Sequence, residues 1–577
     1  MKRWTSVVLW WALAAPVAGA GWPGPQGLAP GAHGLGVPAA GVHVLGAHAL
    51  GLQAFGVQAF GVPAVGARVL VASAAGARAV RAAGSGALGR QDTGEAEKKL
   101  NSTDPKERQE AIRDLAELAG DAWAIVLKKG LRDPEARVAD EAQLRLGELT
   151  NTKSVPLLFG KDGLASGDEW VRVRVAEALG RMDVPLEAKT LVGQLDERAP
   201  AVRRTLVWTL ERRERAGRLS DAERGAFAAA LQKLAEKDKD PDVRAAATVA
   251  GFRMLTTMQG APGESVRGAL LEQALAGKAW QVRAAGGLCA LDLGRDVQLA
   301  TLEKFATDEH PGPRALAVGA VAALEPNADG TIAAAKLLVD RLEFDTNQRI
   351  RLDAYDALVR LSGFKYPLSP KPWRDWLRDP RPYGEKATNT PMGEYVGVTM
   401  TTFAGMRVRS QRVAFLIDLS GSMWEPKADG KTRKAAVDVE FERALSQLTP
   451  ETQFNLIPYT QDPIPWQKKL VPATPQNVKA ALEFFKGCTQ RGKGNFWDAW
   501  QLALSDPAVD SVVVLTDGAP TGGRRWNLEL MRPLLAEQNR FRRVALDAIL
   551  VDAKGHLTEL WKAMCADNRG TVHSSEL

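Results

Sequence analysis

The spacing of apolar residues changes twice along the chain and divides it into three parts. Residues 36–70 form an array of five-residue units that each begin with glycine, and a period of five matches neither a helix nor a strand. From about residue 95 to residue 363 the apolar residues follow helical spacing. After residue 410, apolar runs of strand length alternate with amphipathic stretches. The 577 residues are too many for one hydrophobic core, so we expect several domains.

The central part repeats one helical phrase. In the unit that starts at Asp168, an apolar face is formed at positions i, i+3, i+4 and i+7 by Val175, Ala178, Leu179 and Met182. An aspartate that opens a unit can cap the helix, and a proline suits its first turn. Intervals of roughly 30 to 40 residues predict an α-solenoid of stacked helix pairs, because one pair cannot bury both of its faces. The phrases begin at Asp104, Asp133, Asp168, Ala199, Asp240, Trp280, Asp308 and Asp345.

The phrase approximates the pattern D-x-x-V-R-x-x-A-A-x-A-L, for example in DEWVRVRVAEALGRM from Asp168. It resembles the HEAT repeat family, including the short HEAT-like repeats of bilin lyases. The resemblance implies a solenoid over residues 95–363 that serves as a binding scaffold, and it says almost nothing about chemistry.

The last part of the chain predicts a doubly wound α/β domain over residues 408–577. Strands that are apolar throughout and that alternate with helices are typical of a parallel sheet covered on both faces. The predicted strands are 413–417, 454–459, 511–515 and 544–551, and the predicted helices are 433–448, 475–485 and 557–566. Residues 364–407, rich in proline and tryptophan, are interpreted as a connector that packs against a domain. The run from Met400 to Arg412 predicts an edge strand.

Oxygen-bearing side chains follow two of these strands. Asp418, Ser420 and Ser422 come directly after the first strand, and Asp517 follows the third. Ligands bind such sheets at the carboxyl ends of the strands. Oxygen ligands with open positions suit Mg²⁺, with Mn²⁺ or Ca²⁺ as alternatives, and the two carboxylates balance the charge of the cation.

The stretches FLIDLSGSM and VVVLTDGAPTGG resemble the von Willebrand factor A (VWA) domain and its metal-ion-dependent adhesion site. The resemblance implies that Asp418, Ser420, Ser422 and Asp517 hold the metal, and that a carboxylate of a protein partner completes its shell. Gly494 stands where the family has a metal-facing threonine. Asn495, Thr489 or a water molecule are the candidates to replace that oxygen.

The N-terminus has the pattern of a secretion signal over residues 1–20. Lys2 and Arg3 precede an apolar stretch, and Ala18-Gly19-Ala20 fits a cleavage site after Ala20. Residues 21–94, with the elastin-like pentads, are interpreted as a disordered low-complexity segment. We therefore expect a secreted or periplasmic protein without a transmembrane span after signal removal, similar to secreted bacterial-type proteins that combine VWA and HEAT modules.

Composition and charge narrow the function classes. The net charge of +7 is spread along helices that also carry acidic residues, so we interpret these charges as solvated helix faces and expect no nucleic-acid binding. The three cysteines form no disulfide framework, and a bridge between Cys488 and Cys565 remains open. No nucleophile–base pair or zinc cluster is found, so we expect no enzyme; a hydrolase that uses Asp418, Asp517 and Mg²⁺ is the competing hypothesis.

The sequence thus predicts a binding or adhesion protein with a divalent-cation site on a VWA domain and a HEAT scaffold. The alternative is a structural protein of the cell envelope, in which the solenoid and the pentad tract bind partners and the metal site is degenerate.

Overall fold

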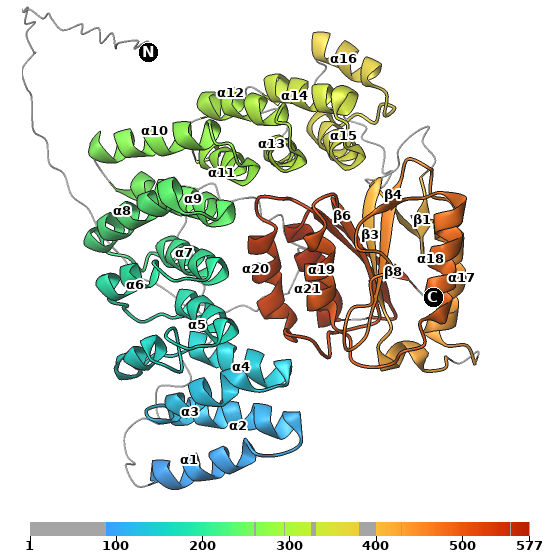
Figure 1. The fold of residues 1–577 in the computed structure, drawn as a ribbon. Coiled ribbons are helices and arrows are strands. Elements are labelled where there is room, and N and C mark those ends of the chain that lie inside the picture. Colours follow the sequence, from blue (N-terminus) through green and yellow to red (C-terminus); the bar gives the residue numbers. More distant parts are fainter. Residues whose placement is uncertain are drawn as a thin grey trace, which may run out of the picture. The chain divides into compact units, whose positions relative to one another are not determined.

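The computed structural model describes residues 88–258, 261–292, 295–324, 331–379, 400–427, 430–553 and 555–575 (Figure 1). The predicted signal peptide and the pentad tract lie outside these residues. Helix α1 (Leu88–Lys99) begins before residue 95, where the sequence predicts the solenoid to start.

The first part of the described chain is helical. Its α-helices after α1 are α2 (Pro105–Leu118), α3 (Ala122–Lys128), α4 (Ala136–Gly147), α5 (Glu169–Arg181), α6 (Ala188–Gln194), α7 (Pro200–Arg215), α8 (Asp221–Lys237), α9 (Pro241–Thr257), α10 (Ala261–Leu275), α11 (Trp280–Ala290), α12 (Arg295–Ala306), α13 (Pro311–Ala322), α14 (Thr331–Phe344), α15 (Gln348–Ser362) and α16 (Pro370–Arg378). Gly130–Arg132 and Thr152–Phe159 form 3₁₀ helices. None of the described helices is both long and apolar enough to cross a membrane.

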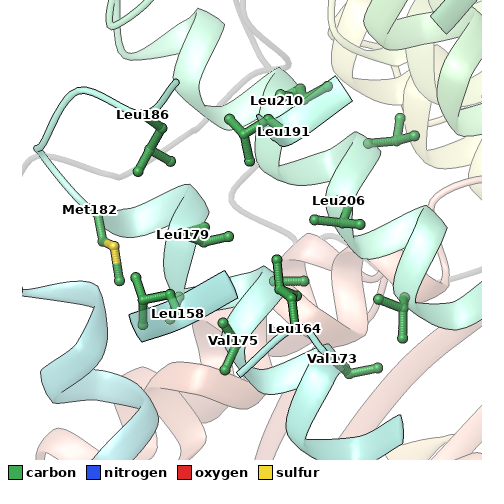
Figure 2. Packing of buried hydrophobic residues seen from close by; sticks show 14 of the residues in the cluster. Leu158, Leu164, Val173, Val175, Leu179, Met182, Leu186, Leu191, Leu206 and Leu210 are labelled. Carbon is green, nitrogen blue, oxygen red and sulfur yellow. The ribbon is translucent and has the colours of Figure 1, made fainter. Parts of the chain in front are cut away.

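These helices stack as a solenoid. Helices α5, α7, α9, α11, α13 and α15 each pack against the next and form one row, while α8, α10, α12 and α14 pack against this row (Figure 1). The apolar stripe predicted from Asp168 onward is fully buried at Val175, Leu179 and Met182, which lie among leucines of neighbouring elements (Figure 2). The predicted repeat of stacked helices is confirmed as a helical solenoid.

In several of the phrases an arginine links successive repeats. The guanidinium of Arg203 donates to the carbonyl of Glu197 at 2.8 Å and to both oxygens of Asp238 at 2.7 Å. Arg314 repeats this arrangement with the carbonyl of Asp308 and the carboxylate of Asp345. The phrase therefore encodes an ion-paired joint between neighbours as well as an apolar face.

The aspartates that open the phrases have two different roles. Asp104, Asp168 and Asp240 accept backbone N–H groups as helix N-caps, as predicted. Asp308 and Asp345 lie two residues before the N-caps of α13 and α15, which are His310 and Asn347. Their carboxylates accept hydrogen bonds from the arginines that link the repeats.

The interpretation of the helix charges as solvated faces is wrong for one row of the solenoid. This row packs against the C-terminal domain through ion pairs, and we call this set of contacts the domain interface. Its buried pairs include Arg349 with Asp547 at 2.7 Å and Glu211 with Arg540 at 2.6 Å. Arg174 and Asp140 form a buried pair inside the solenoid at 2.6 Å, and each also bonds to the backbone of the C-terminal domain. Charges at these positions are covered because a second domain lies on them, which helical periodicity alone does not reveal.

The C-terminal domain is an α/β sandwich. Its six-stranded sheet has the order β5-β4-β3-β6-β7-β8, in which β5 runs antiparallel to β4 and the other neighbouring strands are parallel. Helices α17 and α18 cover one face, and α19, α20 and α21 cover the other (Figure 1). The elements are β3 (Arg412–Asp418), α17 (Arg433–Ser446), β4 (Gln453–Tyr459), β5 (Val471–Pro472), α18 (Pro475–Gly487), α19 (Phe496–Ser505), β6 (Ser511–Thr516), α20 (Leu528–Gln538), β7 (Ala545–Val551), α21 (His556–Asp567) and β8 (Val572–Ser575), with a 3₁₀ helix at Gly421–Trp424.

The predicted α/β elements are confirmed with small shifts at their ends. Thr474 caps α18 through its hydroxyl, as the sequence predicts. The prediction missed the short edge strands β5 and β8 and the helices α19 and α20. These edge strands have only two and four residues, so they carry little alternation that could reveal them.

The connector packs against the solenoid through its tryptophans. Trp373 and Trp376 of α16 are buried with α14 and α15, and the Trp373 indole N–H donates to the carbonyl of Pro367 at 3.1 Å. The predicted packing is confirmed for these residues.

The edge strand predicted from Met400 to Arg412 is wrong. This stretch contains a separate hairpin of β1 (Thr402–Phe403) and β2 (Met406–Arg407) before β3 begins. Ala404 and Gly405 form the turn with φ angles of +46° and +84°, a conformation that reverses the chain before it can extend the main sheet.

All three cysteines are buried and free. Cys488 and Cys565 belong to the cores on opposite faces of the sheet, so no bridge joins them in this structure.

We predict that Arg314→Met lowers the free energy of unfolding by about 3–5 kcal/mol, because the buried carboxylate of Asp345 loses its two hydrogen bonds from Arg314 and keeps only the longer ion pair with Arg341 at 3.7 Å. Lys371→Met, which breaks an exposed pair with Asp375, serves as the control and should cost less than about 1 kcal/mol. Urea unfolding of both variants measures the difference. Equal costs would contradict the role given to the linking arginines.

Candidate metal site

The candidate site lies at the carboxyl end of β3, the strand at the centre of the sheet. Asp418 is the last residue of β3 and lies opposite Tyr459 of β4. The neighbouring strand on the other side, β6, ends at Thr516, so Asp517 begins its loop at the same edge of the sheet. Parallel strands thus bring together oxygens that stand about a hundred residues apart in sequence.

Short hydrogen bonds fix the Asp418 carboxylate. Oδ1 accepts from the backbone N–H of Ser420 at 2.8 Å, and Oδ2 accepts from the Thr516 hydroxyl at 2.7 Å. The hydroxyl oxygens of Ser420 and Ser422 lie 3.3 Å apart. The predicted Asp-Ser-Ser set therefore converges on one turn.

Burial makes the negative charge of Asp418 costly. Asp418 is only 3% exposed, and desolvation raises the pKa of its carboxyl to about 6 against the opposing hydrogen bonds, with a smaller contribution from the charge of Asp517. A cation at this point would relieve both the desolvation and the repulsion between the two carboxylates.

Gly494 faces the Asp418 carboxylate. A Cβ atom at Gly494 would lie 3.4 Å from Oδ2 and 3.5 Å from Oδ1, which are ordinary contact distances. The threonine expected here by family resemblance would therefore point into the site. The Gly421 N–H donates to the carbonyl of Gly492 at 3.0 Å, and this hydrogen bond joins the turn of Ser420 and Ser422 to the loop that contains Gly494.

The two residues considered as replacements for that threonine are placed differently. Asn495 is buried and caps α19, with Oδ1 accepting from the Asp498 N–H and Nδ2 donating to the carbonyl of Gln461 at 2.9 Å. Its amide is therefore committed to the local fold. Thr489 is exposed just after α18, and no contact joins it to the set around Asp418 within the described residues.

Sequence reasoning missed three hydroxyls near the site: that of Thr516, which donates to Asp418, and those of Tyr459 and Thr521. The Tyr459 side chain is buried beside Asp418, and its hydroxyl makes no hydrogen bond within the described part of the chain. The Thr521 hydroxyl accepts from the Gly494 N–H at 2.7 Å, while the Thr521 N–H donates to the Gly494 carbonyl at 3.0 Å. The pairing of Thr521 with Gly494 depends on a loop contact that has no signature in spacing.

The donor chemistry fits a hard cation. The set offers two carboxylates and two serine hydroxyls, which suit Mg²⁺ better than a soft metal. Among the described residues, no group of three or more histidine, cysteine, aspartate or glutamate side chains lies in a metal-binding arrangement, so the candidate site depends on its hydroxyls.

Comparison with curated proteins points to one protein class. The chain is 34% identical over 131 residues to the human inter-alpha-trypsin inhibitor heavy chain H4, and 31% identical over 126 residues to the human heavy chain H3. These matches cover 21% and 20% of this chain, and only 13% and 14% of the relatives. This similarity supports a VWA domain. It supports neither HEAT repeats nor a bacterial type.

No family model matches the chain. Solved structures with partial likeness include an engineered protein, with a TM-score of 0.26 and 18% identity, over 46% of this chain and 78% of that one. Kap121p gives a TM-score of 0.29 and 16% identity, over 50% of this chain and 35% of that one. A mutant of the PilB minor pilin from Streptococcus sanguinis gives a TM-score of 0.23 and 13% identity, over 30% of this chain and 59% of that one. Scores this low support no conclusion about fold or function.

The desolvated carboxylate predicts a specific pH dependence. Because the pKa of Asp418 is about 6 in the folded C-terminal domain and lower in the unfolded chain, its contribution to stability is complete below about pH 4 and is lost as the pH rises to 6. In chelator, the parent should lose up to about 3 kcal/mol relative to Asp418→Asn between pH 4 and pH 7. Denaturant unfolding of both proteins across this range measures it. A constant difference would contradict the burial argument.

Proposed function

We propose that the VWA domain binds a divalent cation through Asp418, Ser420, Ser422 and Asp517, and uses it to bind an acidic group of a protein partner. Mg²⁺ is the proposed ion, with Mn²⁺ and Ca²⁺ as substitutes. The protein is then a binding or adhesion protein and not an enzyme.

The single observation that carries this proposal is the pair of carboxylates at one sheet edge, one of them buried. Asp418 is desolvated, and Asp517 adds a second negative charge near it. Two serine hydroxyls stand at the same turn. Such a set is costly without a cation and well suited to one.

The partner chemistry follows from the coordination. A cation held by two carboxylates and two hydroxyls keeps open positions, and a carboxylate from another protein is a suitable ligand for one of them. The similarity to inter-alpha-trypsin inhibitor heavy chains agrees with a protein-binding role for the VWA domain. We further propose that the N-terminal signal directs the protein out of the cytoplasm, where such binding would take place.

One observation favours the alternative function. Gly494 supplies no side-chain oxygen where the family resemblance places a threonine, and Asn495 is committed to its helix cap. If this loss has abolished metal binding, the solenoid, proposed to be of the HEAT type, and the pentad tract would bind partners as an envelope scaffold.

The proposal predicts that the full-length protein binds Mg²⁺ and Mn²⁺ saturably and that Asp418→Ala abolishes this binding. Ser422→Ala should weaken binding less, because it removes a neutral ligand and leaves the charge balance intact. Calorimetric titration measures all three proteins, and circular dichroism checks that the variants are folded. Equal binding by Asp418→Ala and the parent would refute the assigned site.

A second prediction concerns the missing oxygen. Gly494→Thr should tighten Mg²⁺ binding roughly tenfold, which corresponds to about 1.4 kcal/mol, because the added hydroxyl points toward Asp418. Gly494→Ala adds the same Cβ without the hydroxyl and serves as the control. If both variants bind alike, the hydroxyl adds nothing, and Thr521 or water already fills the position.

A further inference from the structure

The loop that carries Asp517 is attached to the solenoid at its far end. This loop runs from Asp517 to Asn527, between β6 and α20. The carboxylate of Asp140 in α4 accepts from the backbone N–H groups of Trp526 and Asn527, at 2.7 Å and 2.9 Å. A solenoid carboxylate therefore binds the N-terminal end of a helix in the other domain, where backbone N–H groups favour negative charge.

Asp140 is itself held in a buried network. Its Oδ1 accepts from Arg174 at 2.6 Å, and Arg525 of the loop lies 3.4 Å from the same oxygen. Burial opposes its charge, but the two arginines outweigh this and keep the pKa of Asp140 below its usual value. Arg174 also donates to the carbonyl of Arg524 at 3.0 Å, so two consecutive solenoid helices bind the same loop.

The second loop of the site also contacts the solenoid. Lys493, which precedes Gly494, forms an ion pair with Glu135 at the start of α4, with N–O distances of 2.6 Å and 2.7 Å. Within the VWA domain the two loops bind each other through Gly494 and Thr521. They also approach closely at Gly523, where a Cβ would lie 1.8 Å from the Asn495 amide oxygen. The loops thus form one unit that the solenoid contacts at both ends.

We propose that Asp140 and Glu135 of the solenoid are positioning residues of the VWA metal site. They contact no metal ligand directly. They fix the loops that present Asp517 and the backbone around Gly494, and this inference rests on the proposed metal function. The solenoid is then part of the binding site, although nearly four hundred residues separate Asp140 from the loop that it holds.

The domain interface offers a matched control. Glu211 of α7 is also a buried solenoid carboxylate that pairs with an arginine of the VWA domain, Arg540, at 2.6 Å. Arg540 follows α20 and lies outside the loops of the metal site. Asp140→Asn and Glu211→Gln each weaken a buried contact of the domain interface, but only Asp140→Asn touches the Asp517 loop.

The test uses the full chain and Mg²⁺ alone as the probe. Asp140→Asn should weaken Mg²⁺ binding about tenfold, because residues that orient metal ligands typically change affinity by about 10- to 100-fold. Glu211→Gln should stay within about twofold of the parent. Glu135→Gln, at a half-exposed position with little risk to folding, should weaken binding in the same direction as Asp140→Asn. Equal Mg²⁺ affinities for Asp140→Asn and Glu211→Gln would overturn the inference.

Amide hydrogen exchange in chelator tests the positioning without metal. Exchange at residues 492–495 and 517–527 should accelerate in Asp140→Asn and stay unchanged in Glu211→Gln. If the parent binds no Mg²⁺ but this exchange pattern is observed, the proposed function fails while the positioning role stands. If exchange in these loops rises equally in both variants, the solenoid supports the domain in general, and the positioning role is refuted.

Discussion

The desolvated carboxylate of Asp418 is the constraint on which the functional account depends. Asp418 is the last residue of a central strand of the sheet, and its carboxylate accepts a hydrogen bond from the Thr516 hydroxyl. The carboxylate of Asp517 lies near it at the same edge. A buried charge of this kind is costly unless a partner neutralises it. The turn with Ser420 and Ser422 supplies the neutral oxygens that a hard cation needs beside the two carboxylates. The strand order and this turn therefore place all four side chains at one edge of the sheet.

A second constraint is the placement of this edge against the solenoid. The helices of the row that packs against the C-terminal domain have apolar stripes, and they also carry buried acids and arginines that bind this domain. Buried ion pairs add little net stability, but they penalise every misaligned arrangement because a displaced charge stays unpaired. Pairs such as Arg540 with Glu211 therefore fix how the two domains meet, and Asp140 extends this fixation to the loop of the metal site.

The sequence predicts local features well and distant contacts poorly. The solenoid repeat and the strand that ends in Asp418 follow from spacing within a dozen residues. The capping roles of Asp168 and Thr474 follow from side-chain chemistry at helix starts. The ion pair between Lys493 and Glu135 joins residues 358 positions apart, so no local pattern predicts it. The spacing of residues along a helix is also the same whether a charged side chain faces water or is covered by another domain. The role of Asn495 as a helix cap likewise depends on the start of α19, a helix that the sequence did not predict.

The most direct test of the central claim is a crystal structure of the full chain with Mn²⁺, with the anomalous signal recorded at the manganese edge. The account predicts one strong peak between the carboxylates of Asp418 and Asp517, within about 2.5 Å of the hydroxyl oxygens of Ser420 and Ser422. A well-ordered site with no peak at saturating Mn²⁺, or a peak elsewhere in the chain, would contradict the assignment of a cation to this edge of the sheet.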